Sequence, residues 1–301
     1  MLNGFRPSYA MFAFILALAA SACAANATYT YDSAGHLTKL DYGAAGSIAY
    51  TYDKAGNLLS RTVSSSTGPV VHAAVNGASF ASGGIVPGEI ATIFGANLTT
   101  GTGINLTSGL PLLTTFLNAS VMVNGEAAPL FAIDNVNGQQ QINFQVPWEV
   151  AGKPSATIEV SLNGAVSPAL QVPVLAAQPG IINYAGAGGN FGVILHADFQ
   201  LADTAHPAVA GEIVLIYCTG LGAVSSTPAD GAAASGQSTL VAAEVTIGGI
   251  KSTVIFSGLA PGFVGLNQVN VQVPAGLKSG NQPVVVTSGG VSSNSVLLPV
   301  Q

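Results

Sequence analysis

The heptapeptide Gln141-Ile142-Asn143-Phe144-Gln145-Val146-Pro147 occurs a second time in this chain as Gln268-Val269-Asn270-Val271-Gln272-Val273-Pro274. Successive side chains of a strand point to opposite faces, so Ile142, Phe144 and Val146 share one face while Asn143 and Gln145 share the other. The pattern predicts a strand with one buried and one solvated face. The closing proline ends it, because proline has no N–H for the sheet ladder. A duplicated strand of this kind predicts a duplicated domain.

The repetition continues on both sides of the two heptapeptides. Further pairs recur in the same order: Gly88-Glu89-Ile90 with Gly211-Glu212-Ile213, Asn124-Gly125 with Gly248-Gly249, Asn163-Gly164 with Gly289-Gly290, and Val172-Pro173-Val174 with Leu298-Pro299-Val300. Asn-Gly between alternating apolar runs is the strongest short signal for a hairpin turn. Short strands joined by such turns predict an all-β fold class, with two tandem immunoglobulin-like β-sandwiches behind a short β-hairpin segment.

Composition agrees with an all-β chain. Of 301 residues, 49% are hydrophobic and only 7% are charged, against a usual charged share of about 25%. The 37 glycines and 16 prolines indicate many turns. The net charge of −6 provides no basic footprint, which argues against nucleic acid or anionic lipid as a partner.

We divide the chain into six segments. They are a signal peptide (1–27), two short repeats (28–63), a linker (64–69), a first sandwich (70–176), a connector (177–210) and a second sandwich (211–301). The linker is rich in serine, a composition typical of flexible connections. The connector is long for a structureless loop, so we expect it to pair with one of the sandwiches.

The N-terminus has the features of a secretory signal. Arg6 precedes an apolar run over residues 10–19 that is too short for a stable membrane anchor, and Ala25-Asn26-Ala27 fits the A-x-A cleavage pattern. Cys23 offers an alternative. Ala20-Ser21-Ala22-Cys23 loosely resembles a bacterial lipobox, in which Cys23 would be the lipid attachment site, although Ala20 stands where leucine is usual. The sequence predicts export by ordinary cleavage.

The other cysteine, Cys218, lies in the apolar run Ile213-Val214-Leu215-Ile216-Tyr217-Cys218. A lone cysteine in such a strand is usually a small buried hydrophobe. A reactive thiol is the alternative, but Cys218 has no basic neighbour in sequence to lower its pKa.

Two copies of a short motif follow the signal. Tyr31-Asp32-Ser33-Ala34-Gly35-His36-Leu37 returns as Tyr52-Asp53-Lys54-Ala55-Gly56-Asn57-Leu58, and the Asp-to-Gly segments indicate hairpin turns. The pattern resembles the YD repeats of Rhs-type surface and toxin-delivery proteins, in which many copies form a β shell. Two copies cannot close one, so we expect a remnant or a hairpin pair. Cross-strand aromatic packing is favoured over sugar binding for Tyr29, Tyr31, Tyr50 and Tyr52.

A second resemblance covers most of the remaining chain. Residues 87–98 resemble the signature strand of IPT/TIG immunoglobulin-like domains. The ordered segments 75–80, 87–98, 141–149, 179–181, 220–222 and 230–231 resemble the C-terminal domain of exported acidobacterial (Solibacter-type) proteins. The resemblance implies display, anchoring or export at the cell surface, and it carries no activity.

Candidate sites for chemistry are few. The sequence contains no H-E-x-x-H, C-x-x-C or G-x-S-x-G motif. His196, Asp198, Asp203 and His206 lie close together, but their spacing matches no metal signature, so a polar loop is favoured. Residues 134–138 superficially resemble a calcium loop but lack its distal glutamate, so a hairpin turn is favoured there.

Two sets of residues are candidates for ligand contact. Trp148, the only tryptophan, is either a ligand platform or, as we favour, a packing residue at the sandwich edge. Asn143, Gln145, Asn270 and Gln272 either line an amide-rich carbohydrate face, form the solvated sides of their strands, or pair between the two domains.

We therefore interpret the chain as a non-enzymatic exported module, secreted, periplasmic or on the outer surface, for display, structural support or protein interaction. The alternative is a carbohydrate- or matrix-binding module, which would show exposed aromatic side chains on one strand face. An enzyme is the least favoured interpretation, because no catalytic motif is present. No cofactor is expected. The expected partner is an unidentified surface protein or polysaccharide, not nucleic acid, with membrane contact only through a lipidated Cys23.

Overall fold

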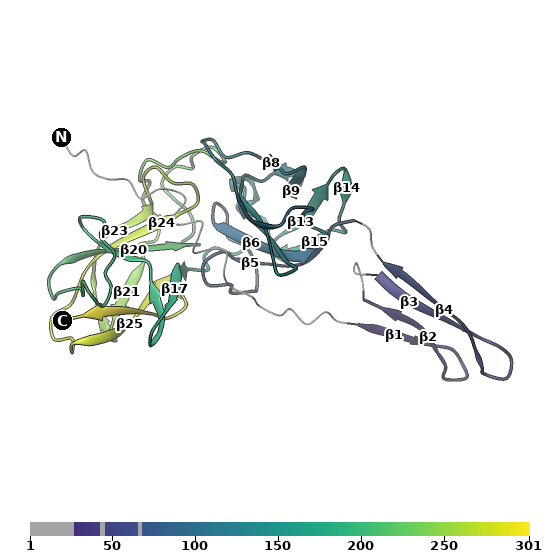
Figure 1. The fold of residues 1–301 in the computed structure, drawn as a ribbon. Coiled ribbons are helices and arrows are strands. Elements are labelled where there is room, and N and C mark those ends of the chain that lie inside the picture. Colours follow the sequence, from purple (N-terminus) through teal and green to yellow (C-terminus); the bar gives the residue numbers. More distant parts are fainter. Residues whose placement is uncertain (1–26, 43–45, 66–67) are drawn as a thin grey trace.

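The computed structural model describes residues 27–42, 46–65 and 68–301. Within these ranges the regular structure is β-strand, apart from the single 3-10 turn η2 over Trp148–Val150. Figure 1 shows a small sheet at one end of the chain, followed by two larger β bodies. The predicted all-β fold class, with two tandem immunoglobulin-like sandwiches, is confirmed. Cys23 and the apolar run of the expected signal peptide lie outside the described residues.

The small sheet, called here the projecting sheet, is built from the two short repeats. Its four antiparallel strands lie in the order of the chain: β1 (Thr28–Tyr31), β2 (Leu37–Asp41), β3 (Gly46–Tyr52) and β4 (Leu58–Ser65). Figure 1 shows it extending away from the sandwiches. Each repeat forms one hairpin, as the motif predicts.

An aspartate fixes the turn of each hairpin. Asp32 Oδ1 accepts hydrogen bonds from the backbone N–H groups of Ala34 and His36, both at 2.9 Å. Asp53 repeats the arrangement in the second hairpin, at 2.9 Å from the Ala55 nitrogen and 2.8 Å from the Asn57 nitrogen. Aspartate side chains stabilise turns in this way because they satisfy backbone donors that the strands leave free. The repeated Asp therefore explains the repeated turn.

The first sandwich has two facing antiparallel sheets. The five-stranded sheet runs β5 (Val70–Asn76), β6 (Ile90–Ala96), β12 (Gln139–Gln145), β11 (Leu130–Val136), β7 (Gly103–Leu106). The six-stranded sheet runs β10 (Glu126–Ala127), β9 (Ala119–Val123), β13 (Ser155–Leu162), β14 (Ala165–Val166), with β15 (Leu170–Pro173) and β8 (Thr115–Phe116) off this path. The heptapeptide strand β12 is central to its sheet, between β6 and β11.

The second sandwich repeats this plan. Its five-stranded sheet runs β16 (Gly180–Ile181), β20 (Ile213–Thr219), β24 (Asn267–Gln272), β23 (Thr253–Leu259), with β19 (Ile194–His196) beside β20. The facing sheet runs β17 (Asn183–Gly186), β18 (Gly189–Gly192), β27 (Val296–Val300), β25 (Gly280–Ser288), β21 (Glu244–Ile247), β22 (Ile250–Lys251), with β26 (Val291–Ser292) beside β25. Residues 180–196 of the expected connector thus pair with β20 and β27.

Details of backbone geometry recur at equivalent places in the two sandwiches. Both central residues of the Asn124-Gly125, Asn137-Gly138, Asn163-Gly164, Gly248-Gly249 and Gly289-Gly290 turns have positive φ, the geometry of type I′ hairpins. An isolated parallel bridge also joins Ile85 to Val174 in the first sandwich and Ala208 to Val300 in the second. The two sandwiches therefore share one topology.

Each sandwich has its own apolar core, and β12 supplies Ile142 and Phe144 to the first core, both fully buried. The expectation that the opposite side of β12 is solvated is wrong. Asn143 is 1% exposed and Gln145 is 0% exposed. The reason is that Asn143 lies in a buried polar layer, whereas Gln145 is covered by the second sandwich. In β24 the expectation holds better, since Asn270 is half-buried and Gln272 is exposed.

Candidate functional site

The two sandwiches meet along an apolar layer, called here the seam. Its buried members are Ala78 and Ile90 from the first sandwich and Ile182, Val193, Leu195, Leu215, Tyr217, Ala260 and Leu266 from the second. Tyr217 is the largest of them, and burial raises its pKa to about 12. Burial of apolar surface is the main favourable term in association of folded units. The seam therefore joins the sandwiches into one body.

Polar side chains at the ends of strands β5 and β6 cross the seam. The Asn76 amide nitrogen donates to Glu89 Oε2 at 3.0 Å and to the Gln178 carbonyl oxygen at 2.9 Å. Its amide oxygen accepts from the Ala78 nitrogen at 3.0 Å. Glu89 Oε1 in turn accepts from the Val86 nitrogen at 2.8 Å. Buried polar groups are retained at low cost when they are paired in this manner.

The end of β20 completes the polar contact. The Ile90 backbone N–H donates to the Thr219 hydroxyl at 2.8 Å, and that hydroxyl donates to the Gly265 carbonyl at 2.9 Å. Gly220 follows with φ +79°, and a Cβ there would fall 2.9 Å from Glu89 Oε2 and 3.0 Å from the Asn76 amide nitrogen. Only glycine fits this position without a shift, because both the dihedral angle and the space exclude a side chain.

Glu89 is the acid of the seam whose pKa is shifted most from its ordinary value. The side chain is 2% exposed, and burial raises its pKa to about 8, although the Val86 and Asn76 hydrogen bonds act in the opposite direction. The carboxyl group is therefore mostly protonated at neutral pH, since removal from water disfavours the charged form. An acid with a raised pKa is common at catalytic sites, but the groups that bond to the Glu89 carboxyl are the Val86 backbone and the Asn76 side chain of the seam.

A second contact is made by a loop of the second sandwich, residues 224–239, called here the arm. A Val224–Thr239 bridge closes its base. At its tip the Gly231 N–H donates to Gln145 Oε1 at 2.7 Å, and the Gly231 carbonyl accepts from the Leu112 nitrogen at 2.9 Å. The arm thus covers the end of β12 and hides the side of that strand that the sequence predicts to be solvated.

Trp148 lies between the arm and the first sandwich. It packs against Val224 and Leu259 of the second sandwich, and its ring occupies the space that a Cβ on Gly88 would need. Its backbone nitrogen donates to Asp230 Oδ1 at 3.2 Å. Trp148 is therefore a packing residue, as the sequence favours, but it packs between the sandwiches and not at an outer edge.

Asp230 has a second acid beside it. Its pKa is raised to about 7, mainly by burial and also by the neighbouring carboxyl of Glu149, while the Trp148 N–H acts in the opposite direction. Two carboxyl groups at one contact cannot both ionise freely. Glu149 belongs to the first sandwich and Asp230 to the arm, so the charge of this pair bears on how the two bodies hold together.

The seam gathers residues that are far apart in the sequence. Asn76, Glu89, Thr219, Gly220 and Asp230 lie within or beside the segments that resemble the exported C-terminal domain, and all of them meet at this interface. Sequence reasoning missed the roles of Asn76, Glu89 and Thr219. The signal that pointed to them was only the fixed order of those segments. The arrangement can hold the two sandwiches together, because hydrogen bonds join them at several points.

The amide side chains of the two heptapeptide strands are hydrogen-bonded within the protein. Asn143 accepts from the Thr92 hydroxyl at 2.6 Å and is buried, and Gln145 is bonded to the arm. In β24, Gln268 donates to Asn270 at 2.7 Å and Gln272 donates to the Gly211 carbonyl at 2.9 Å. For Gln145 the structure shows pairing between the two domains.

The histidine and aspartate residues of the connector separate into pairs. His196 lies 3.3 Å from Glu212, while His206 lies 3.3 Å from Asp203. Asp198 caps a turn by accepting from the Gln200 nitrogen at 3.0 Å. No group of three or more His, Cys, Asp or Glu side chains within the described ranges is arranged to hold a metal.

The 134–138 segment is a hairpin turn, and Asp134 lies at its base. Asp134 is 2% exposed and accepts from the Asn105 nitrogen and the Gln141 amide, both at 3.1 Å. Burial raises its pKa above the usual value. Its oxygens are thus committed to protein donors.

Cys218 is a buried core residue. Its side chain is 0% exposed within the apolar core of the second sandwich, and burial raises the pKa of the thiol. A thiol that stays protonated and inaccessible is a poor nucleophile.

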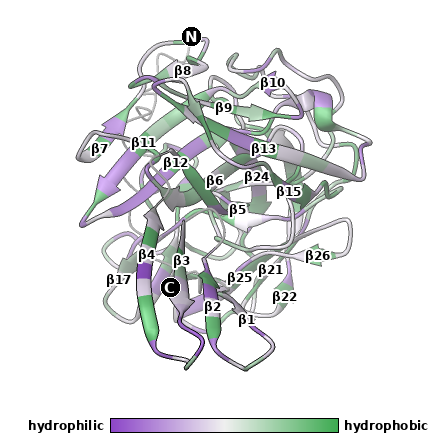
Figure 2. Cartoon of the chain, turned by 90° about the vertical axis from the view of Figure 1, so that its right-hand side faces the viewer, coloured by the Kyte–Doolittle hydropathy of each residue, from purple (hydrophilic) through white to green (hydrophobic). Residues whose placement is uncertain are grey.

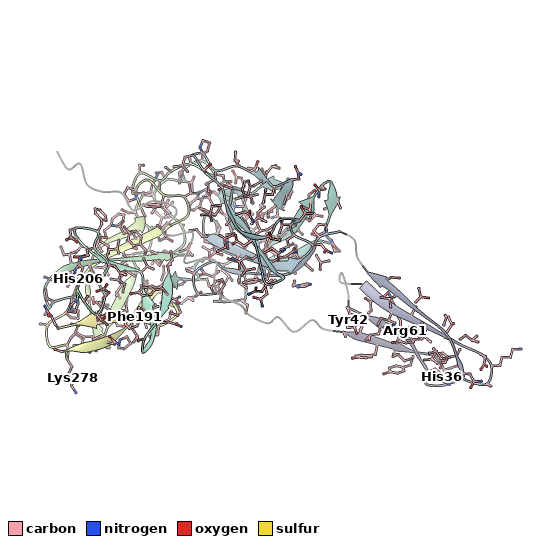
Figure 3. The ribbon with its side chains drawn as sticks, viewed as in Figure 1. His36, Tyr42, Arg61, Phe191, His206 and Lys278 are labelled. Carbon is pink, nitrogen blue, oxygen red and sulfur yellow. The ribbon has the colours of Figure 1, made fainter. Side chains whose placement is uncertain are left out.

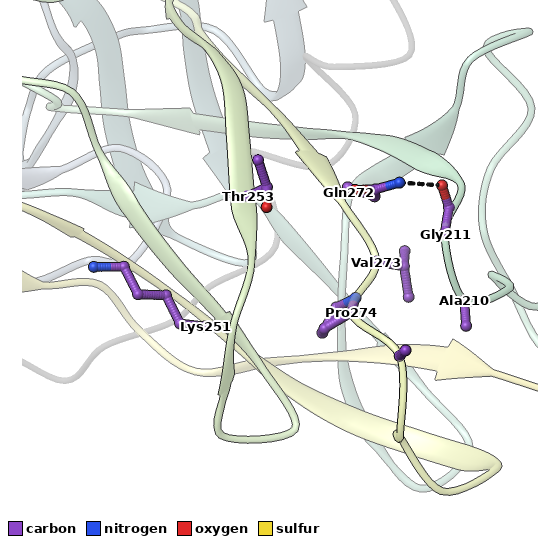
Figure 4. Close-up of a pocket in the computed structure, with 8 residues that line it drawn as sticks. Ala210, Gly211, Lys251, Thr253, Gln272, Val273 and Pro274 are labelled. Atoms are coloured by element: carbon purple, nitrogen blue, oxygen red, sulfur yellow. Dashed lines mark hydrogen bonds between the residues drawn. The ribbon is translucent and has the colours of Figure 1, made fainter.

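One surface hollow lies on the second sandwich, between β23, the end of β24 and the segment before β20 (Figure 4). It holds about 370 Å³, and Lys251 is the one titratable residue among those that line it. Lys251 is ion-paired with Glu244 at 3.2 Å. Gln272 and Gly211 are bonded to each other across its wall. The hollow therefore presents few free polar groups for a ligand.

The projecting sheet is the most exposed element. None of its described residues from 27 to 64 is buried, and Figure 3 shows His36, Tyr42 and Arg61 placed along it. Tyr52 makes an aromatic contact with His36, a partner that the sequence analysis did not name, at 4.7 Å between ring centroids. Tyr29 and Tyr31, by contrast, are 56% and 58% exposed.

The register of the projecting sheet gives it two unlike faces. Tyr29, Leu40, Ile48 and Val63 are paired in one row across all four strands. The adjacent row, Thr30, Lys39, Ala49 and Thr62, points to the opposite side. Figure 2 shows hydrophobic positions along β2 and β4. The sheet is therefore amphipathic, with an uncovered apolar face.

Comparison with known proteins finds one family model that matches the projecting sheet. The family model of the RHS repeat matches residues 31–67. That match covers a small part of the chain and agrees with the YD-repeat interpretation. No curated protein matches the sequence. Within the described ranges, no helix has the length and apolar character needed to cross a membrane.

Several solved structures show weak likeness. SGBP-B of a mixed-linkage glucan utilization locus from Bacteroides ovatus is 13% identical with a TM-score of 0.31, over 90% of this chain and 57% of that one. SGBP-B of a xyloglucan utilization locus from Bacteroides uniformis is 11% identical with a TM-score of 0.26, over 77% and 49%. A titin immunoglobulin tandem is 10% identical with a TM-score of 0.20, over 78% and 96%. This chain spans about half the length of the first two.

Proposed function

We propose that this protein is an exported, non-enzymatic surface module whose joined sandwiches form a rigid base and whose projecting sheet is presented for protein interaction. One observation carries the proposal. The sheet has no buried residue from 27 to 64 among those described, whereas both sandwiches have cores and share the buried seam. An uncovered apolar face on a soluble protein is a mark of an interaction site.

The rest of the chain supports a structural base. Glu89 and Asp230, the two acids with strongly raised pKa values, lie at the contact between the sandwiches. The connector histidines His196 and His206 are paired with carboxylates. Export is supported by Arg6, the apolar run and the A-x-A pattern, with lipid attachment at Cys23 as the alternative. The resemblance to an exported C-terminal domain supports the same location.

The experiment measures location and presentation together. Intact cells of the native host are treated with a membrane-impermeant amine-reactive reagent, and the protein is recovered for intact-mass and peptide analysis. We expect a chain that begins near Thr28 and carries label on Lys39 and Lys54, which are exposed on the projecting sheet. Lipid on Cys23 would identify a lipoprotein with the same role. Recovery of an unlabelled chain from the cytoplasmic fraction, with residues 1–27 intact, would overturn the proposal.

A carbohydrate-binding role is the second candidate, and one observation favours it. Tyr29 and Tyr31 are both more than half exposed on the edge strand β1. Exposed aromatic rings on one strand supply the apolar platform that sugar rings pack against.

The carbohydrate-binding role is tested by removing the aromatic rings of Tyr29 and Tyr31. The chain is assayed by co-sedimentation with a panel of insoluble polysaccharides, next to Tyr29→Ala/Tyr31→Ala and Tyr29→Phe/Tyr31→Phe variants. Binding that survives the Phe changes and is lost with Ala would support a sugar platform. Equal binding by the unmodified chain and both variants would show that Tyr29 and Tyr31 are not the sugar platform, and absence of binding would leave only the protein-interaction role.

A further inference from the structure

The two repeats of the projecting sheet bind each other through their strands. The last strand of the first repeat, β2, pairs antiparallel with the first strand of the second repeat, β3. The register places Lys39 opposite Ala49, Leu40 opposite Ile48 and Asp41 opposite Ser47. One copy of the motif is therefore a natural neighbour for the next copy.

The two outer strands of the sheet occupy the same places in their repeats as the two strands of this internal junction. By sequence repetition β4 is the counterpart of β2, and β1 is the counterpart of β3, with Tyr29 in the place of Tyr50. Within the described residues, β1 pairs only with β2, and β4 pairs only with β3. Each end of the sheet thus presents a strand whose counterpart in the other repeat is paired inside the chain.

The edges carry little of the usual protection against pairing. Natural sheets block open edges with proline, with charges or with very short edge strands. The sandwiches use two-residue edge strands such as β10 and β22. In the projecting sheet, β1 has neither charge nor proline and is exposed throughout, while β4 is eight residues long with Arg61 as its one charge.

We propose that a second copy of this chain adds its β1 to β4 of the first, antiparallel, in the register that the internal repeat fixes. In this register Ser60 lies opposite Thr28 of the added copy, and Leu59 lies opposite its Tyr29. Ser60 and Thr28 both belong to the polar side of the sheet. Leu59 and Tyr29 are 65% and 56% exposed, so the added strand would bring two uncovered apolar side chains together. The inference rests on the proposed role of the sheet as the presented surface.

The geometry of such addition is head-to-tail. Each copy offers β4 to one neighbour and β1 to another, so the contact is heterologous and does not close at two copies. We therefore expect a concentration-dependent series of assemblies and not a single dimer. The sandwiches would lie outside the shared sheet, which matches their position beyond its end in Figure 1.

Two variants that differ at a single position test the register. Thr28→Lys/Ser60→Lys places like charges opposite each other across the new junction, whereas Thr28→Lys/Ser60→Glu places opposite charges there. Within one chain Ser60 faces Thr51, which is neutral, and Thr28 faces Asp41, so neither variant creates a like-charge pair internally. The purified chains are compared by sedimentation equilibrium, and the His36 ring signals, stacked on Tyr52, report by NMR that the sheet is folded.

We expect the mass of the unmodified chain to rise with concentration. The Lys/Lys variant should need on the order of tenfold higher concentration than the Lys/Glu variant for equal association. An unmodified chain that stays monomeric up to about 100 μM, beyond ordinary micromolar affinity, would overturn the inference. So would equal association of the two variants. Surface labelling on Lys54 would still stand in either case, so failure here is distinguishable from failure of the proposed function.

Discussion

Gln145 accepts a hydrogen bond at 2.7 Å from the backbone N–H of Gly231, which belongs to the other sandwich. Gln145 ends the heptapeptide strand β12, and Gly231 lies at the tip of the arm. The equivalent residue of the second sandwich, Gln272, is exposed, and its side chain donates to the Gly211 carbonyl within the same sandwich. Two copies of one heptapeptide therefore have different tertiary roles.

This difference predicts unequal effects of the same substitution. Gln145→Ala should lower the free energy of unfolding by about 1–2 kcal/mol, because it leaves the buried Gly231 N–H without an acceptor. Gln272→Ala should change it by less than about 0.5 kcal/mol, because water replaces its exposed partner. Urea unfolding followed by circular dichroism measures both. Equal losses at the two positions would contradict the assigned role of the arm.

A substitution at Gly220 tests whether the seam has room for a side chain at this position. Gly220→Ala should destabilise the protein by about 2–4 kcal/mol and shift Trp148 emission to the red, because a Cβ meets Asn76 and Glu89. The control is Gly138→Ala in a hairpin turn. Its φ of +81° is nearly that of Gly220, and a Cβ there meets nothing within 4 Å. That change should cost only the dihedral strain, about 1 kcal/mol. Similar losses in both would show that the seam tolerates a side chain.

Glu89 predicts that stability falls as pH rises. Its carboxyl titrates near 4.5 when unfolded and near 8 when folded, so between these values the folded state holds the extra proton. Stability is then greatest below about pH 4.5 and is lost as pH rises through about 8, by ~1.4 kcal/mol per pKa unit at most. Asp230, whose folded pKa is raised to about 7, adds an effect of the same sign.

The measurement is urea unfolding at several pH values from about 5 to 8. Glu89→Gln should lower stability overall, because one of its two donors then faces an amide nitrogen, but it should also flatten the pH dependence. Glu159→Gln, on the half-exposed part of β13, is the matched control and should keep the original slope. A slope that is unchanged in Glu89→Gln would mean that the carboxyl is ionised in the folded protein.

Phe144 predicts the cost of disrupting the first core. Phe144→Asp should unfold the first sandwich, with a loss of at least about 4 kcal/mol, because it buries an unpaired charge at a fully buried position. Gln139→Asp, at the exposed start of the same strand, should leave the thermal unfolding curve nearly unchanged. A soluble Phe144→Asp protein with an unaltered curve would show that the core assignment is wrong.

Local features of the fold were predictable from the sequence. The Asn137-Gly138 and Asn163-Gly164 turns have positive φ at both residues, and the Asp32 and Asp53 turns are closed by their own side chains. These outcomes depend on neighbouring residues alone, since turn geometry is set by local sterics and short-range hydrogen bonds. The duplication of the sandwiches was also predictable, because the repeated strands and turns occur in the same order along the chain.

For the strand faces, the sequence predicted which side chains enter the core but not what covers the polar side chains. Alternation in the heptapeptide placed Phe144 correctly in the core, but it could not show that Gln145 is covered by the arm or that Asn143 joins a buried polar layer with Thr92. A polar residue at an alternating position is predicted to face solvent, and the alternation carries no information about a segment, distant in the sequence, that covers it. The covering residues come from more than fifty positions away in sequence.

The sequence by itself determined the all-β class, the two sandwiches of one topology, the hairpin turns and the pair of YD repeats. Only the tertiary structure decided that Asn76, Glu89 and Thr219 meet in one seam, and that the projecting sheet keeps an uncovered face. The physical reason is range. Alternation and turn chemistry act between neighbours, whereas burial of Glu89 and exposure of Tyr29 depend on which distant surfaces pack together and which do not.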